Sequence, residues 1–120
     1  MKYYLNDSEY RFMCIVWDVE PINSMELVRI CYDKLGWKKS TTFTVIRNLC
    51  KKQILSNENT VVKALVSRSN IQKQEAHEFL DKKFQGSLPA FISAFLQDKK
   101  LTREEAEYLQ KLIDDIKEDK

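Results

Sequence analysis

Only two glycines interrupt this chain, Gly36 and Gly86, and fifty positions separate them. A loop that cradles a phosphate needs several glycines within a few residues, because only glycine lets the backbone close on the anion. The chain has only two prolines, so four residues in all are of the types that most often interrupt helices and strands. Average usage, roughly 7% glycine and 5% proline, would give a chain of this length about fourteen such residues. The sequence therefore favours helices and excludes a glycine-rich phosphate loop.

The side chains that carry most enzyme chemistry are also scarce. The chain contains one histidine, His77, which argues against a catalytic triad and excludes a zinc site built on paired histidines. Its three cysteines, Cys14, Cys31 and Cys50, are odd in number and lie in apolar patterns. This spacing favours reduced core thiols over a disulfide framework or a metal cluster. We expect a protein that is not an enzyme and uses no metal or cofactor.

The distribution of apolar residues predicts a water-soluble protein. The longest apolar runs are short, as in Met13–Trp17, and a bilayer span needs about 20 residues. The first residues lack the apolar segment of a signal peptide. With 43% hydrophobic and 32% charged residues, the chain has enough apolar side chains for a core. We expect a cytoplasmic location without direct membrane insertion.

Charge is distributed unevenly, although the net charge is only +2. Between Lys34 and Asn57 there are six basic residues and no acid, whereas from Asp98 onward eight acids face six bases. A basic surface on a nearly neutral molecule is typical of proteins that bind polyanions. A solvated helix face is the simpler alternative, so charge alone does not decide.

Two helices are predicted near the start of the chain. Asp7 or Ser8 is expected to cap the first, and this helix should end before Pro21, because the residue preceding proline leaves the α region. Asn23 or Ser24 is expected to cap the second.

A third, basic helix should follow. Gly36 suits the left-handed residue that ends the second helix, and Ser40 is expected to cap the third. The apolar side of the third helix should carry Thr42, Val45, Ile46 and Leu49. The opposite side should carry Ser40, Phe43, Thr44, Arg47 and Lys51.

Two short β-like runs come next, Ile54–Ser56 and Val61–Val66, separated by residues 57–60. Helix, helix, turn, basic helix and hairpin is the order of a winged helix-turn-helix, whose third helix enters a DNA major groove. The acid-free stretch coincides with that helix. We therefore predict a mainly α fold with a small β-hairpin, in which residues 1–68 form a winged-helix domain that binds double-stranded DNA.

Residues 69–120 are predicted to form a helical dimerisation region. Three helices are expected, the last beginning at a capping box of Thr102 and Glu105. The many large apolar groups in so short a segment favour a homodimer, while helices folded back on a monomer remain the alternative. The expected contact residues are Phe84, Leu88, Phe91, Ile92, Phe95, Leu109, Leu112, Ile113 and Ile116.

Several segments, taken together in this order, resemble a known family. These are Leu5–Tyr10 with the following Met13, Ile15 and Trp17; Trp37–Lys52; Gly86–Leu88; and Phe95–Leu96 with Leu101–Glu105. The chain is similar to the penicillinase and methicillin-resistance repressors and their copper-responsive relatives. The resemblance implies a dimeric repressor that binds a palindromic operator.

On this basis side chains of the third helix divide into two groups. Phosphate contacts are expected from Lys38, Lys39, Lys51 and Lys52, with Ser40 beside them and Lys63 on the returning strand. Base-edge contacts are expected from Thr41, Phe43, Thr44 and Arg47, with Arg47 able to fork onto guanine. A buried core aromatic is the alternative for Phe43. The acidic Glu58 at the hairpin tip would repel a phosphate.

The resemblance also implies a switch. In antibiotic-responsive members a membrane sensor-protease system leads to cleavage between Asn and Phe in the dimerisation region, and Ala94–Phe95 occupies that position here. The asparagine is absent, as are the glycine expected at Gln53 and the cysteine-rich tail of the copper-responsive branch. Direct copper sensing is not expected. The alternative function is a winged-helix module that binds a protein partner without sequence-specific DNA binding.

Overall fold

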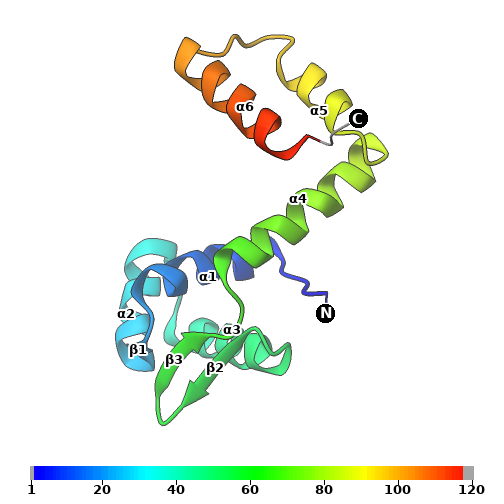
Figure 1. Ribbon diagram of the computed structural model, residues 1–120. Helices are drawn as coiled ribbons and strands as arrows, with labels where there is room; N and C mark the ends of the chain where they lie inside the picture. The colour runs from blue at the N-terminus through cyan, green and yellow to red at the C-terminus, as the bar shows by residue number, and fades with distance from the viewer. Residues whose placement is uncertain (1, 118–120) are drawn as a thin grey trace. The chain divides into compact units, whose positions relative to one another are not determined.

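The computed structural model describes residues 2–117. Met1, which begins the first expected domain, and residues 118–120, which end the second, lie outside the described part. Figure 1 shows the described elements. In chain order they are α1 (Asp7–Val19), β1 (Ile22–Asn23), α2 (Ser24–Leu35), α3 (Lys39–Lys51), β2 (Leu55–Glu58), β3 (Val61–Ala64), α4 (Arg68–Phe84), α5 (Leu88–Phe95) and α6 (Arg103–Ile116). The mainly helical fold with one small sheet is confirmed. The chain divides into two compact units, Met1–Ala76 and His77–Lys120.

A capping box fixes the start of α1. The Asn6 side chain accepts a hydrogen bond from the backbone N of Glu9 at 2.8 Å, and Glu9 Oε1 accepts one from the backbone N of Asn6 at 3.0 Å. Glu9 selects Asn6 as the cap, because the box needs its acid three residues after the capping residue. The predicted caps, Asp7 and Ser8, are wrong and lie in the first turn. The helix ends at Val19 with Glu20 as its C-cap, directly before the proline, as expected.

The ends of α2 agree with the prediction. The Asn23 side chain accepts a hydrogen bond from the backbone N of Met25 at 2.8 Å and so caps the helix. Gly36 has a left-handed φ of 71°, and its backbone N donates to the carbonyl oxygen of Tyr32 at 3.0 Å. This conformation favours glycine, because a side chain there would strain the backbone.

Packing of an aromatic pair precedes the start of α3. Trp37 stacks on Phe12, with ring centroids 5.9 Å apart and ring planes 8° apart. The next residue, Lys38, is the N-cap and makes no side-chain capping hydrogen bond. The predicted cap, Ser40, is therefore wrong and lies inside the first turn. A tertiary contact, rather than a capping side chain, sets where the chain enters α3.

The hairpin and β1 form a three-stranded antiparallel sheet in the order β1-β3-β2. Asn59 and Thr60, with φ of 51° and 64°, connect β2 to β3. Asn57 and Glu58 belong to β2, so the predicted four-residue connection over 57–60 is wrong. The prediction also missed β1, whose two residues are too short to show any periodicity.

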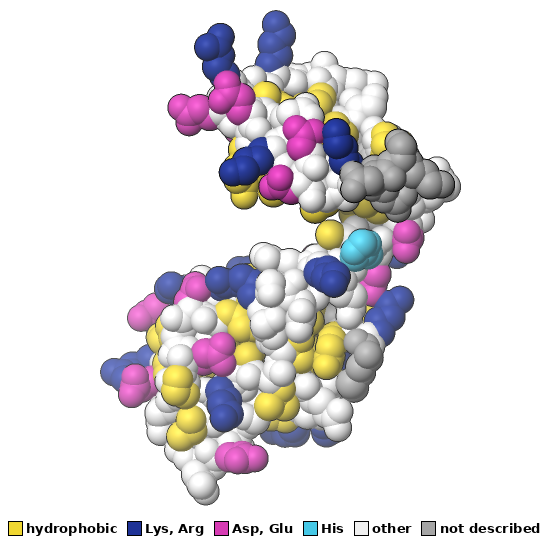
Figure 2. Space-filling model, viewed as in Figure 1, with side chains coloured by type: hydrophobic (Ala, Val, Ile, Leu, Met, Phe, Trp, Pro, Cys, Tyr) yellow, Lys and Arg dark blue, Asp and Glu magenta, His cyan; other side chains and the backbone are white. Residues whose placement is uncertain are grey.

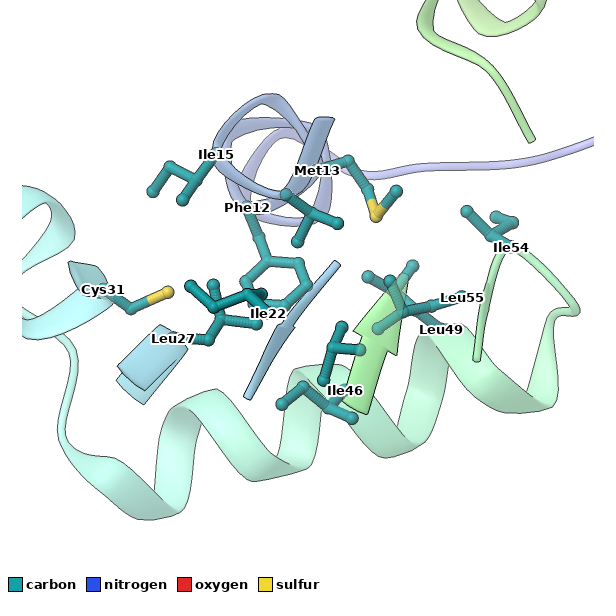
Figure 3. Close-up of a cluster of buried hydrophobic side chains, with 12 residues drawn as sticks. Phe12, Met13, Ile15, Ile22, Leu27, Cys31, Ile46, Leu49, Ile54 and Leu55 are labelled. Atoms are coloured by element: carbon teal, nitrogen blue, oxygen red, sulfur yellow. The ribbon is translucent and has the colours of Figure 1, made fainter. Parts of the chain in front are cut away.

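The core of the first unit lies between α1, α2, α3 and the sheet. In Figure 3, Phe12 points from α1 toward Ile22 and Leu27, and Ile46 and Leu49 extend toward it from α3. All five are buried, and full burial of one such side chain contributes roughly 1.5–3 kcal/mol. The other buried members are Met13, Ile15, Val16, Cys31, Ile54, Leu55 and Val62.

The first unit includes the beginning of α4. Ile71 is buried, and the Gln74 side chain accepts a hydrogen bond from the backbone N of Tyr3 at 2.9 Å and donates one to its carbonyl oxygen. These contacts hold the first turns of α4 within the first unit, which therefore extends to Ala76. The sequence placed the boundary earlier, after residue 68, because it contained no sign of these long-range contacts.

The second unit is held together by aromatic contacts rather than by a buried core. Phe91 contacts Phe84 and Phe79, with ring centroids 5.5 and 5.8 Å apart. The capping box of Thr102 and Glu105 at the start of α6 is present as predicted. No residue of α5 or α6 is buried within the described chain.

Candidate nucleic-acid interface

One side of α3 is polar, positively charged and exposed. Its opposite side carries the buried residues Thr42, Ile46 and Leu49, which fix the rotation of the helix. The helix contains no acidic residue. The exposed side chains here, beginning just before the helix, are Lys38, Lys39, Ser40, Thr41, Thr44, Arg47, Asn48 and Lys51. The structure thus brings together most residues that the sequence assigned to DNA binding.

Phe43 has an intermediate position. It is half-buried and packs against the hydrophobic core, and Lys39 Nζ lies 6.0 Å from its ring centroid. The core contact agrees with the alternative of a core aromatic, and the DNA contact of the partly exposed side chain stays a prediction.

Lys52 differs from the other lysines. Its ammonium lies 2.7 Å from Glu9 Oε1 and donates to the carbonyl oxygen of Tyr4 at 3.1 Å. The Lys52 side chain is 34% exposed. Its charge is already paired within the fold, which argues against the predicted phosphate contact of Lys52.

The β2–β3 hairpin is the wing of this fold. An open groove of about 380 Å³ lies between α3 and the wing. The residues that line it are Phe43, Ile46, Arg47, Cys50 and Asn57. Four of these five come from α3 and follow the spacing of one helix face, and the fifth comes from β2.

The register of the hairpin decides which wing side chains face this groove. Asn57 pairs with Val62, which is buried, so Asn57 lies on the sheet face that covers the core. Neighbouring residues of a strand point to opposite faces. Glu58 therefore lies on the other face, together with Lys63, whose partner is Ser56. The acidic side chain that argued against a DNA-contacting wing thus points away from α3.

Sequence reasoning left two exposed amides, Asn48 and Asn57, without a role. Helical spacing could have found Asn48, because it lies four positions after Thr44 and on the same outward side of α3. No comparable signal existed for Asn57, because its direction depends on a strand register that the sequence leaves open.

The residues predicted to form a dimer contact are accessible in the second unit. Figure 2 shows hydrophobic side chains at the surface of this unit. Phe84 and Phe91 are half-buried. The exposed ones are Leu88, Ile92, Phe95, Leu109, Leu112, Ile113 and Ile116, the last being 80% exposed. Monomeric proteins seldom expose so many large apolar side chains in so small a unit.

The bond between Ala94 and Phe95 lies in the last turn of α5. Both residues are exposed, and Lys99 Nζ lies 5.6 Å from the Phe95 ring centroid.

The cysteines lie within the first unit. Burial raises the pKa of the Cys31 thiol and that of the Cys50 thiol, so both stay protonated near neutral pH. Residues 2–117 contain no cluster of three or more His, Cys, Asp or Glu side chains that could hold a metal ion. Within the same residues no helix is both long and apolar enough to span a membrane.

The order of elements in the first unit, with an exposed basic helix directly before a hairpin, places the protein in the winged helix-turn-helix class. The chain belongs to the penicillinase repressor family, because the family model described as "Penicillinase repressor" matches residues 5–115. Members of this family are transcriptional regulators and not enzymes, and membership supports a role as a transcriptional repressor.

Two relatives illustrate the similarity. A "Penicillinase repressor" of Bacillus licheniformis is 26% identical over 118 residues, which cover 94% of this chain and 91% of that protein. An "Uncharacterized 16.5 kDa protein in ptsI 3'region" of Latilactobacillus sakei is 37% identical over 54 residues, which cover 45% of this chain and 37% of that protein.

Proposed function

We propose that this protein is a homodimeric repressor that binds a palindromic operator in double-stranded DNA, with α3 in the major groove. The observation that carries the proposal is the exposed, acid-free side of α3 beside a hairpin. An α-helix fits the major groove, and side chains on its outward face reach base edges. Similarity to a protein named as a penicillinase repressor adds support.

The exposed side chains of α3 divide by chemistry. We assign phosphate contacts to Lys38, Lys39 and Lys51, since their ammonium groups are exposed at the two ends of the helix. We assign base-edge contacts to Thr41 and Thr44, which lie three positions apart on the outward side.

The second unit would supply the dimer contact. Its exposed apolar side chains on α5 and α6 would be covered by the same surface of a second copy, as in a two-fold symmetric dimer. Two recognition helices related by this axis would meet half-sites about one turn of DNA apart. We further propose that cleavage at Ala94–Phe95, by a protease linked to a membrane sensor, relieves repression by separating α6 from the rest of the chain.

Selection of duplexes from a random-sequence library, followed by binding measurements over a range of salt concentrations, tests the proposal. We expect the full chain to enrich a palindromic sequence and to prefer it over a scrambled duplex. Affinity should fall steeply with salt, because each phosphate neutralised contributes about 0.9 to the slope of log affinity against log salt. Absence of any enrichment, preference and salt dependence would contradict DNA binding and favour the alternative, a module that binds a protein partner.

A further inference from the structure

The groove between α3 and β2 combines an apolar floor with two polar groups. Phe43, Ile46 and Cys50 supply apolar atoms, Ile46 being buried and the other two half-buried. Arg47 and Asn57 are exposed, and they place a guanidinium on the helix side and an amide on the wing side. Both groups donate hydrogen bonds, and a guanidinium recognises planar or tetrahedral anions with several N–H groups at once.

We infer that this groove holds one sugar-phosphate unit of the DNA backbone, with the phosphate between Arg47 and Asn57 and the deoxyribose against the apolar floor. The inference rests on the proposed function, because it assumes that α3 lies in the major groove. A backbone strand borders that groove, so it lies beside a helix placed there. The occupant therefore matches the groove, because a phosphate anion is joined to a sugar ring whose carbon atoms can lie against the apolar floor.

The charges around the groove agree with this occupant. The stretch from Lys34 to Asn57 has six basic residues and no acid. The hairpin register directs Asn57 to the sheet face beside α3 and Glu58 to the opposite face. The wing thus offers the groove an amide donor and keeps its carboxylate on the other side.

This inference changes the role of Arg47. The sequence suggested that Arg47 reads a guanine, but its side chain lines the same groove as Phe43 and Asn57, at the edge of the helix surface next to the wing. A phosphate contact positions the protein on DNA without reading sequence, whereas a guanine contact contributes to specificity. A phosphate contact predicts an equal loss of affinity for every duplex when Arg47 is replaced, whereas a guanine contact predicts a loss of preference for the enriched duplex.

The test uses the full chain, a duplex enriched by the wild-type protein and a scrambled duplex of equal length. Arg47→Gln should lower affinity for both duplexes by the same factor and reduce the salt slope by about 0.9. Asn57→Asp, which replaces an amide by a carboxylate of the same shape, should lower affinity for both by about tenfold or more, and Asn57→Ala by about threefold to tenfold, the range for one lost hydrogen bond. Glu58→Gln, on the opposite face of the same strand, is the matched control and should not weaken binding.

Thermal unfolding of each variant should match the wild type, because both side chains are exposed. Loss of preference for the enriched duplex in Arg47→Gln, with an unchanged salt slope, would overturn the inference and restore guanine recognition. Wild-type affinity of Asn57→Asp would overturn it as well. If the wild-type chain enriches no duplex, the proposed function fails first, so the two failures are distinguishable.

Discussion

Lys52 Nζ lies 2.7 Å from Glu9 Oε1, so the residue that follows α3 is tied to the first turn of α1. The same ammonium lies 5.6 Å from the ring centroid of Tyr4. The Glu9 side chain is only 6% exposed. A carboxylate so little exposed depends on its partner, because a buried charge without compensation is strongly destabilising. Lys52 therefore links the end of α3 to the first turn of α1 within the fold.

We expect Lys52→Met to lower the free energy of unfolding by about 2 kcal/mol, less than the cost of breaking a fully buried pair because Lys52 is partly exposed. Urea unfolding checks the stability. The salt slope of DNA binding should remain that of the wild type at temperatures where the variant is folded. Lys51→Met is the matched control, since its exposed side chain should affect the slope by about 0.9 and stability little. A reduced slope in the Lys52 variant would return this residue to the DNA contacts.

Gln53 lies where the family resemblance leads one to expect glycine, and its backbone has a left-handed φ of 63°. Its backbone N donates to the carbonyl oxygen of Cys50 at 3.0 Å, and the backbone N of Ile54 donates to that of Leu49 at 3.1 Å. This pair of bonds is the one that forms when a helix ends on a left-handed residue, so α3 ends through the conformation of Gln53. A residue with a side chain is strained there. We therefore expect Gln53→Gly to raise the melting temperature and to stabilise the fold by about 1 kcal/mol.

The reverse change at Gly36 is the control for this prediction. Gly36 has a φ of 71°, and a Cβ built there would meet no atom within 4 Å. Gly36→Ala should therefore destabilise by about 1 kcal/mol through backbone strain alone. Equal melting temperatures for wild type and both variants would contradict the assignment of strain to these two helix ends.

Thr42 carries a polar atom in an apolar site. Its Oγ1 is buried and has no partner with hydrogen-bond geometry among the described residues. The nearby Cys31 sulfur is only a weak acceptor for this hydroxyl: burial raises the pKa of the Cys31 thiol, and the Thr42 hydroxyl opposes this rise only in part. A buried hydroxyl without a good partner costs free energy. Thr42→Val keeps the shape and should stabilise the fold by about 1 kcal/mol, as measured by chemical denaturation.

Thr44→Val provides the comparison, because Thr44 is exposed on the other side of α3. We expect it to change stability by less than about 0.5 kcal/mol while altering the preference among DNA sequences. A loss of stability in Thr42→Val would show that its hydroxyl has a partner after all.

Local rules in the sequence sufficed for the features that depend on neighbouring residues. The end of α2 at Gly36, the end of α1 before Pro21 and the Thr102–Glu105 capping box each follow from a few adjacent residues, and the structure contains all three. Helical spacing also predicted which polar side chains of α3 lie on its exposed side. These features need no information about distant parts of the chain.

Features that depend on tertiary contacts could not be predicted. The start of α3 is set by the packing of Trp37 on Phe12, and the extent of the first unit by Gln74 on Tyr3. Charge counting placed Lys52 among the DNA contacts, because its pairing with a residue 43 positions away leaves no local trace. The sheet face on which the Asn57 side chain lies depends on the register between β2 and β3, which the sequence leaves open.

The apolar surface of the second unit predicts that a single charge prevents assembly. Leu112 is 43% exposed on α6, so an aspartate there remains compatible with the unit itself but would be buried without a partner in a dimer. We expect Leu112→Asp to give a monomer by sedimentation, with folded helices by circular dichroism. Operator affinity should then fall steeply, because two linked half-site contacts gain from their effective concentration. Lys111→Asp introduces an aspartate at the neighbouring exposed position, with an even larger change of net charge, and should remain dimeric. An unchanged dimer in Leu112→Asp would show that α6 does not form the contact between copies.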